Sequence, residues 1–333
     1  MVILIVIILL SFVLCAGLTF AMMPVFARYL TAQPNERSGH RVPTPQGGGA
    51  AVVIVTVLCV WIGIVASDYN VNGLRLHILA CSAVFLAIVG ALDDKWDVPP
   101  LVRFIGQVAA VAVVLMWGVD GSNILEAYMP YQVVFLVTIL AGTWFINLVN
   151  FMDGVDLIVV GEMVPLTACI GLLGWFGFLG SLESLVAVAL CGSLLGFALF
   201  NWPRAKLFLG DVGSLPIGLI VAWLLYETAA QGYWAVAILL PLYFCADATV
   251  TACRRLVNRE QLWKAHRTHY YQRAADSGLS ALRISSTVFA LNLVLCALAI
   301  ATVFWPTPVV QVAAVVGGGG LVGICMRSFS KRM

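Results

Sequence analysis

Charged side chains are scarce in this chain. Only 10% of its 333 residues are Asp, Glu, Lys or Arg, whereas 62% are hydrophobic, and the mean hydropathy is +1.01. A soluble domain of this length could not cover its surface with so few charges. The composition predicts an all-α membrane protein, and we expect one membrane domain over residues 1–333 without a nucleic-acid partner.

Paired cysteines are also lacking. The nine cysteines lie in or beside apolar runs without C-x-x-C spacing. They are therefore interpreted as small core residues rather than as disulfide partners or zinc ligands. No basic segment precedes the first apolar run, which argues against a cleaved signal peptide.

Apolar windows of about 20 residues predict membrane spans. Eleven such windows lie at 2–23, 48–66, 75–92, 102–119, 131–149, 158–179, 183–201, 213–229, 233–251, 284–304 and 308–326. Alternate breaks and the C-terminal tail carry 17 of the 18 basic residues, and only Arg75 falls opposite. By the positive-inside rule the N-terminus lies outside and the C-terminus is cytoplasmic.

Two cytoplasmic segments are long enough to help build a site. Residues 24–49 are rich in Pro and Gly, which predicts a shaped loop rather than a helix. Residues 252–283 mix Arg, His and Tyr, which is typical of a short amphipathic helix followed by a loop.

The few acids in this chain gather where apolar windows end. A carboxylate beside a membrane span is costly and usually marks a site. Asp93 and Asp94 close the third window. Adjacent carboxylates repel each other, which raises at least one proton affinity unless a cation lies beside them. A solvated helix end is the alternative.

Four amide or acid residues follow at three-residue intervals at the end of the fifth window. They are Asn147, Asn150, Asp153 and Asp156. If the helix continues through them, they stay near one face and could offer oxygen ligands to Mg²⁺. A polar seam between helices is the alternative, because Gly154 would weaken the helix there.

A Gly-flanked acid opens the eighth window, in Gly210-Asp211-Val212-Gly213-Ser214. Asp211 could cap the helix or bind a metal. The glycines let backbone N–H groups approach an anion, and Lys206 adds a nearby positive charge.

Histidines occur in two of the basic breaks. His266-Arg267-Thr268-His269 has no H-E-x-x-H pattern or suitable Cys beside it, so donors aimed at phosphate fit better than zinc ligands. A solvated basic loop is the alternative. The segment from Ser38 to Gly49, which includes His40, lacks the context of a Rossmann turn and could close a phosphate site or be a plain connector.

Taken in order, five motifs resemble those of the polyprenyl-phosphate N-acetylhexosamine 1-phosphate transferase family, glycosyltransferase family 4. They are Gly39-His40-Arg41-Val42-Pro43-Thr44-Pro45-Gln46-Gly47-Gly48-Gly49, Asp93-Asp94, Asn147 to Asp156, Gly210 to Ser214, and His266 to His269. One motif alone would be weak evidence. Five in order, all on the predicted cytoplasmic face, make a specific pattern.

The resemblance implies a Mg²⁺-dependent phosphoglycosyl transferase, with Mn²⁺ as a substitute ion. Such an enzyme moves a sugar 1-phosphate from a UDP-N-acetylhexosamine to polyprenyl phosphate, undecaprenyl phosphate in bacteria, and releases UMP. The implied location is the bacterial inner membrane, with the active site on the cytoplasmic face. A homodimer is left open.

The resemblance also implies roles for individual residues. Asn150 and Asp211 would hold the metal, and Asp93, Asp94, Asp153 and Asp156 would be catalytic. Substrate contacts are expected from His40, Arg103, Asn147, Lys206, His266, Arg267 and His269. A phosphate monoester with a second pKa of about 6 is mostly dianionic near neutrality. Asp93 is therefore expected to position the lipid phosphate first and to act as a base second.

Details within the motifs favour one branch of the family. The His266 segment lacks the contiguous triple histidine of the enzyme that uses UDP-MurNAc-pentapeptide. It is closer to the branch that initiates O-antigen or similar surface glycans, including those built on 6-deoxy sugars. Leu157 stands where relatives often have Gly. Arg103 stands where they often have Lys, so a planar guanidinium group replaces a compact ammonium group. The peptidoglycan enzyme and, from another class, an ion-coupled transporter are the alternatives.

Overall fold

The structure, a computed structural model, describes residues 2–32, 43–67, 73–96, 98–119, 129–261 and 266–330. Within these ranges the chain is helical apart from loops and two short paired strands, β1 (Thr31–Ala32) and β2 (Thr44–Pro45). The helices are α1 (Val2–Tyr29), α2 (Gly49–Val65), α3 (Gly73–Trp96), α4 (Pro100–Trp117), α5 (Tyr131–Met152), α6 (Ile158–Trp175), α7 (Ser181–Asn201), α8 (Asp211–Ala230), α9 (Trp234–Leu239), α10 (Leu242–Val257), α11 (Tyr270–Asp276), α12 (Ala281–Phe304) and α13 (Pro308–Ser330).

Most of these helices have the length and composition of membrane spans. Among the described residues, nine helices have at least 18 residues and are apolar enough to cross a bilayer, and α2 has 17 residues. Each of the eleven predicted windows overlaps a helix. The prediction of an all-α protein that crosses the membrane several times is therefore confirmed, whereas the number of spans and their orientation stay predictions.

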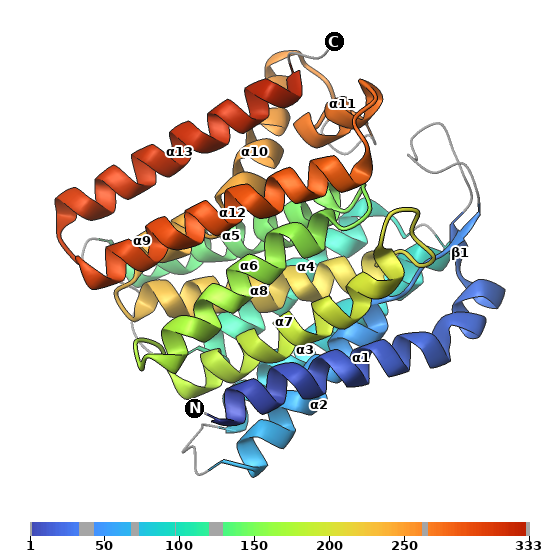
Figure 1. Cartoon of the computed structure of the whole chain (residues 1–333), viewed down its shortest axis with the longest axis horizontal. Coiled ribbons are helices and arrows are strands. Elements are labelled where there is room, and N and C mark those ends of the chain that lie inside the picture. The colour runs from blue at the N-terminus through green and yellow to red at the C-terminus, as the bar shows by residue number, and fades with distance from the viewer. Residues whose placement is uncertain are drawn as a thin grey trace.

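The helices form one bundle in which α7 and α8 are central (Figure 1). In both, 83% of the apolar window is buried, against 28% in α1 and α13. The two chain ends lie at opposite ends of the bundle (Figure 1). Because α8 is packed on several sides, its first turn has a fixed place in the bundle.

The ninth predicted span is wrong as a continuous helix. It is divided into α9 and α10, and Pro241 lies between them. Proline has no N–H to donate, and its ring clashes with the preceding turn. The break leaves the first amides of α10 without partners in their own helix. Glu162 of α6, which is fully buried, accepts one of them, from Phe244, at 3.2 Å.

The two predicted loops also differ from the structure. Helix α1 continues through Pro24 to Tyr29, so the first part of segment 24–49 is helical. In segment 252–283 the first residues belong to α10, and a short separate helix, α11, follows a connection. The apolar windows ended too early because polar residues at span ends can still be helical.

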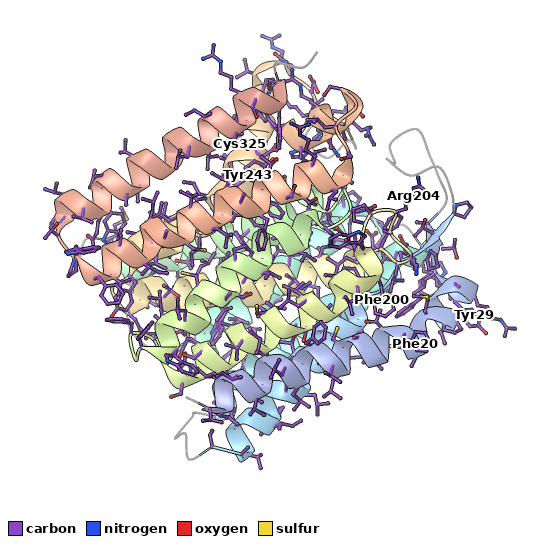
Figure 2. All side chains as sticks on the ribbon, viewed as in Figure 1. Phe20, Tyr29, Phe200, Arg204, Tyr243 and Cys325 are labelled. Carbon is purple, nitrogen blue, oxygen red and sulfur yellow. The ribbon has the colours of Figure 1, made fainter. Side chains whose placement is uncertain are left out.

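One end of the bundle carries nearly all the described basic residues, and we call it the basic end. Tyr29 and Arg204 mark it in Figure 2. These basic residues lie at helix ends, in α11 and in the connections beside α8 and α11. They are Arg28, Lys95, Arg103, Arg204, Lys206, Arg254, Arg255, Arg259, Arg267, Arg273, Arg283 and Arg327. The basic breaks between alternate apolar windows of the sequence thus meet at one end of the folded bundle.

Arg75 lies at the opposite end and is buried. It forms ion pairs with Glu183 at 3.0 Å and with Glu227 at 2.7 Å, which join α3 to α7 and α8. A buried pair of this kind is costly to break, because the remaining charge would stay uncompensated. These far-side charges therefore serve packing.

Two close backbone approaches fix α8 against its neighbours. A Cβ at Gly90 of α3 would lie 2.2 Å from the carbonyl oxygen of Asp211, and a Cβ at Gly49 of α2 would lie 2.1 Å from the Cα of Gly213. Only glycine permits these contacts, so α3 and α2 both touch the first turn of α8.

Gly90→Ala is expected to destabilise the protein by at least about 2 kcal/mol, because the new methyl group meets backbone that cannot yield. Thermal unfolding in detergent, followed by tryptophan fluorescence, should show a lower Tm. Gly106→Ala is the matched control in α4, since its Cβ would lie 3.6 Å from Phe85, an ordinary contact. Equal Tm values for the two variants would contradict this packing.

Candidate functional site

The carboxylate of Asp94 caps the N-terminus of α8. It accepts the N–H groups of Asp211 at 3.0 Å and of Val212 at 3.1 Å, one on each oxygen. These two amides have no partner within their own helix, and the positive end of the helix dipole favours a carboxylate. The last turn of α3 is thereby joined to the first turn of α8.

Asp93 points to a different neighbour. One oxygen accepts the N–H of Val98 at 2.7 Å, and the other forms a short ion pair with Arg103 of α4. The same Arg103 nitrogen lies 3.3 Å from an oxygen of Asp211. Arg103 thus lies between the carboxylates of Asp93 and Asp211. It is the cation that was expected beside the adjacent acids Asp93 and Asp94.

Asn150, near the end of α5, completes this arrangement. Its amide nitrogen donates to Asp211 Oδ1 at 2.7 Å and to Ser214 at 2.9 Å. We call Asp93, Asp94, Arg103, Asn150 and Asp211 the acid–amide cluster. Asp211 and Arg103 keep 24% and 27% of their side-chain surface exposed, whereas Asp93 keeps 9%. A ligand can therefore reach Asp211 and Arg103 first.

Asp211 and Asn150 have the donor atoms that Mg²⁺ requires. A half-turn of the Asn150 amide would bring its oxygen to the place of its nitrogen. The two oxygens would then be 2.7 Å apart, close to the spacing of about 2.9 Å between adjacent ligands of Mg²⁺. No group of three His, Cys, Asp or Glu residues that could hold a metal occurs in the described ranges. Two protein oxygens with water and phosphate is the usual pattern for Mg²⁺.

The four-residue series from Asn147 to Asp156 does not share one helical face. Helix α5 ends at Met152, and Asp153 is already outside it with ψ of 58°. Asp156 accepts the N–H of Ala205 at 3.1 Å and holds the connection before α8. The expectation of a continuous helix through Asp153 and Asp156 is therefore wrong, because the chain turns where Gly154 packs against the Tyr271 hydroxyl.

Leu157 has a positive φ of 63° at the start of α6. This left-handed conformation favours glycine, the residue that the family often has at this position. The N–H of Leu157 donates to the side chain of Asn201 at 2.7 Å. The departure from the family pattern thus leaves the turn in place, held by Asn201.

The histidine segment, His266–His269, is fixed by a residue that the sequence analysis missed. Asp247 of α10 is fully buried and accepts the N–H groups of Tyr270 at 3.0 Å and Tyr271 at 3.2 Å. It also lies 3.2 Å from His269 Nδ1. Asp247 therefore caps α11 and orients the His269 ring.

His266 and Arg267 lie beside this ring. The rings of His266 and His269 stack at 4.9 Å, and Arg267 pairs with Asp276 at 2.7 Å. Burial, and then the nearby His269 and Arg255, lowers the pKa of His266 to about 4. His266 is therefore neutral near pH 7 and acts as a hydrogen-bonding group rather than as a cation.

Contacts at the end of α5 join the histidine segment to the acid–amide cluster. The Tyr271 hydroxyl donates to the carbonyl oxygen of Phe151 at 2.8 Å, and the Phe151 ring lies 6.4 Å from that of His269. Phe151 directly follows Asn150. Motifs more than 100 residues apart in sequence therefore meet at one corner of the basic end.

Three predicted site residues are not seen in contact with the acid–amide cluster or the histidine segment. Asn147 donates to Gln107 of α4 at 2.5 Å and thus forms the polar seam named as the alternative. Lys206 is exposed, and in the described ranges no contact joins its side chain to the acid–amide cluster. His40 lies outside the described residues.

Other polar contacts also escaped the sequence analysis. Gln46 donates to the carbonyl oxygen of Asp94 at 3.1 Å, and Ser214 meets Asn150. Asp247 could have been found, since it is an acid inside a predicted apolar window and the same rule had selected the other acids. The hydroxyl of Tyr271 gave no such sign, because tyrosine is common at span ends.

Fold and geometry together define a multi-span membrane protein with a polar cluster suited to phosphate or a metal at its basic end. The sequence profile of glycosyl transferase family 4 matches residues 76–229, which include the whole acid–amide cluster. The matched region belongs to this family, and the resemblance predicted from the motifs is confirmed. The histidine segment lies beyond the matched range.

Named relatives are similar over a longer stretch. The chain is 32% identical over 237 residues to decaprenyl-phosphate N-acetylglucosaminephosphotransferase of Mycobacterium tuberculosis strain H37Rv, covering 62% of this chain and 58% of that protein. It is 29% and 28% identical over 265 residues to undecaprenyl-phosphate alpha-N-acetylglucosaminyl 1-phosphate transferases of Escherichia coli K12 and Salmonella typhi, covering 75% of this chain and 70% of each. The match thus spans less than two thirds of the mycobacterial relative.

The titration of the Asp153 carboxyl makes the stability of the protein depend on pH. Burial, and then the negative charges of Asp94 and Asp156, raises the pKa of Asp153 to about 7 from an ordinary 3.8. Between these values the folded chain holds a proton that the unfolded chain has lost. This contribution to stability therefore falls as the pH rises from about 4 to about 7.

Asp153→Asn should weaken this pH dependence, because the amide does not titrate. We expect the loss of Tm between pH 5 and pH 8 to be smaller in the variant than in the wild type, measured in one detergent. Glu260→Gln changes an exposed acid and should keep the wild-type slope. An unchanged slope in Asp153→Asn would show that this carboxyl does not titrate there.

Proposed function

We propose that the protein transfers a sugar 1-phosphate from a UDP-N-acetylhexosamine to polyprenyl phosphate and releases UMP. The observation that carries this proposal is the meeting of Asp211, Asn150 and Arg103 at the basic end, inside the region that matches glycosyl transferase family 4. Both substrates are phosphates, and a cation beside oxygen ligands suits them. The names of the relatives support polyprenyl phosphate as the acceptor and an N-acetylglucosamine phosphate as the transferred group.

The place of the cluster suits one lipid and one water-soluble substrate. The acids lie in the last turn of α3 and the first turn of α8, at the end of membrane-length helices. A polyprenyl chain can remain among the lipid chains while its phosphate reaches these turns. By the positive-inside rule the basic end is cytoplasmic, and bacterial relatives support the bacterial inner membrane.

The reaction joins two anions, so charge has to be neutralised first. An oxygen of the lipid phosphate attacks the β-phosphorus of the UDP-sugar, and a new P–O bond forms. The bond between that phosphorus and the bridging oxygen breaks, and its electron pair leaves with UMP. Arg103 can donate to an incoming phosphate, because it is already held between Asp93 and Asp211 with part of its surface exposed.

Asp211 and Asn150 are the residues that would hold Mg²⁺, or Mn²⁺ in its place. The ion would supply positive charge to the diphosphate and to the leaving UMP. This assignment is supported by the 2.7 Å contact between the two side chains and by the exposure of Asp211. Asp94 acts on Asp211 indirectly, since it fixes the backbone amides at which α8 begins.

The reaction needs little proton transfer at this site. A phosphate monoester is mostly dianionic near neutrality, so the acceptor needs a base only for its remaining protonated fraction. Asp153, whose pKa is about 7, can accept such a proton. Asp93 is engaged with Arg103 and Val98, so positioning is its first role.

The histidine segment is assigned to the diphosphate of the nucleotide sugar. Asp247 fixes His269, and Phe151 places this ring beside the end of α5. We propose an N-acetylhexosamine of the N-acetylglucosamine type as the sugar, in line with the relatives' names, with 6-deoxy forms and a role in O-antigen synthesis as finer possibilities to be tested. The interrupted histidine pattern disfavours UDP-MurNAc-pentapeptide.

Purified protein should release UMP from a UDP-N-acetylhexosamine only when both Mg²⁺ and polyprenyl phosphate are present. Asp211→Asn should lower the rate at limiting Mg²⁺ by about a hundredfold or more, because it removes a charged ligand of the ion. UMP release and the lipid product can be followed by mass spectrometry across a panel of UDP-sugars.

Glu260→Gln is the matched control, because it also removes one carboxylate at the basic end, but that carboxylate is exposed and belongs to no part of the acid–amide cluster. It should retain the wild-type rate. Full turnover by Asp211→Asn at limiting Mg²⁺ would overturn the metal assignment. Release of UMP without any lipid would argue against the acceptor.

A further inference from the structure

The glycines of the last helix do not all serve helix packing. A Cβ at Gly318 would lie 2.7 Å from Leu239, so this residue does permit a close contact with α9. At Gly319 and Gly323 a Cβ would meet nothing within 4 Å. These two positions therefore open onto space.

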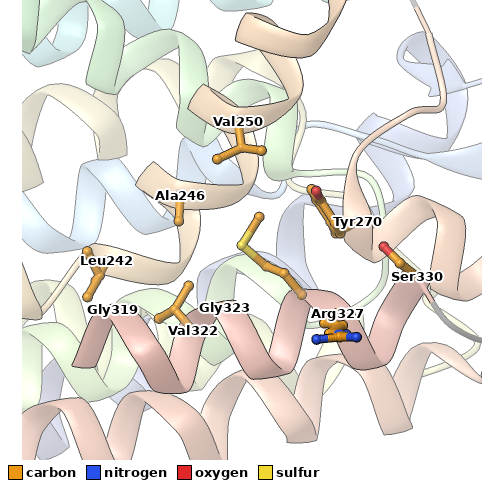
Figure 3. A pocket seen from close by; sticks show the side chains of 10 residues that line it. Leu242, Ala246, Val250, Tyr270, Gly319, Val322, Gly323, Arg327 and Ser330 are labelled. Atoms are coloured by element: carbon orange, nitrogen blue, oxygen red, sulfur yellow. The ribbon is translucent and has the colours of Figure 1, made fainter. Parts of the chain in front are cut away.

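That space is a groove between α10 and α13. It has a volume of about 410 Å³ and is lined mainly by apolar side chains and glycine: Leu242, Ala246, Val250, Tyr270, Gly319, Val322, Gly323, Met326, Arg327 and Ser330. Its two ends differ. Figure 3 shows Tyr270, Arg327 and Ser330 at one end, and Leu242 and Gly319 at the other. The groove is therefore amphipathic along its length.

One guanidinium group lines the polar end of the groove, and two more lie close to the Tyr270 ring, which also lines it. Arg254 lies 5.2 Å and Arg273 lies 5.8 Å from the centre of the Tyr270 ring, and Arg327 lines the groove beside that ring. In the described part of the chain no carboxylate forms an ion pair with any of the three. The nearby acids are engaged elsewhere, Asp276 with Arg267 and Glu260 with Arg255.

We infer that the groove between α10 and α13 binds an anionic membrane phospholipid. Arg254, Arg273 and Arg327 would hold its phosphate, and one acyl chain would lie along Val322 and Gly323. Basic pockets between membrane helices are known to suit such headgroups. Uncompensated guanidinium groups at one end of an apolar groove are complementary to a negatively charged head with an apolar tail.

The occupant of this groove is not the acceptor lipid of the proposed reaction. All lining residues belong to α10, α13 and Tyr270, and none belongs to the acid–amide cluster. A phosphate held here would contact α11 instead. Because Tyr270 is the first residue of α11 and directly follows His269, a bound lipid would stabilise α11 against α13 and thereby steady the histidine segment.

Binding can be measured by native mass spectrometry of the full chain in detergent. Palmitoyl-oleoyl phosphatidylglycerol should bind more tightly than the phosphatidylcholine with the same chains. Arg273→Gln/Arg327→Gln should weaken phosphatidylglycerol binding roughly thirtyfold, about fivefold for each charge removed. Arg28→Gln/Arg204→Gln removes two exposed arginines elsewhere on the basic end and should have no such effect.

The apolar part is tested by filling the groove. Gly323→Leu places a side chain into the groove, at a position where an added Cβ meets nothing within 4 Å. It should weaken phosphatidylglycerol binding about tenfold, because an acyl chain loses buried methylenes. Gly320→Leu is the matched control, since its Cβ also meets nothing within 4 Å but does not line the groove. Phosphatidylglycerol should also slow hydrogen exchange in residues 270–276 of the wild type.

Several results would overturn the inference. Equal binding of phosphatidylcholine would remove the charge selectivity, and displacement of phosphatidylglycerol by the same concentration of inorganic phosphate would leave a headgroup site only. Displacement by polyprenyl phosphate at equal concentration would assign the groove to the acceptor. If Gly323→Leu disrupted a dimer and left lipid binding unchanged, the groove would cover a second copy of the chain.

Discussion

The hydrogen bonds from the first two amides of α8 to Asp94 are the contacts on which the acid–amide cluster depends. They fix the start of a central helix against the end of α3, so that Asp211 points at Arg103 and Asn150. The glycine contact at Gly90 brings the two backbones close enough for this to happen. These amides have no partner within their own helix, and the carboxylate of Asp94 satisfies both of them.

At two other helix starts, an acid also accepts hydrogen bonds from the first backbone amides. Glu162 accepts an amide of α10 after the break at Pro241, and Asp247 accepts two amides of α11. Each acid comes from a helix other than the one it caps, so each cap is also a tertiary contact. Two of the three caps bear directly on functional candidates: Asp94 places Asp211, and Asp247 places His269. Acids that looked like candidates for chemistry thus also hold the scaffold that presents the chemistry.

The scarcity of charge made much of this visible in the sequence. Asp93, Asp94, Asn150 and Asp211 stood out because they interrupt apolar runs, and the structure brings them together with Arg103. Their pairing could not be predicted, since Asp94 and Asp211 are 117 residues apart and spacing gives no information on such distances. Three-residue spacing misled at Asp153 and Asp156, because a period of three suggests a helix but does not say where the helix ends. Asp247 was missed because the acids were sought at the ends of the apolar windows, and Asp247 lies inside one.

Hydrogen exchange in the first turn of α8 tests the central claim most directly. Asp94→Ala removes the acceptor of the Asp211 and Val212 amides, and we expect the peptide over residues 209–216 to exchange faster than in the wild type. The peptide over the middle of α8 should stay protected, since its amides bond within the helix. Unchanged protection of the first turn in Asp94→Ala would contradict the account, because those amides would then have a different partner.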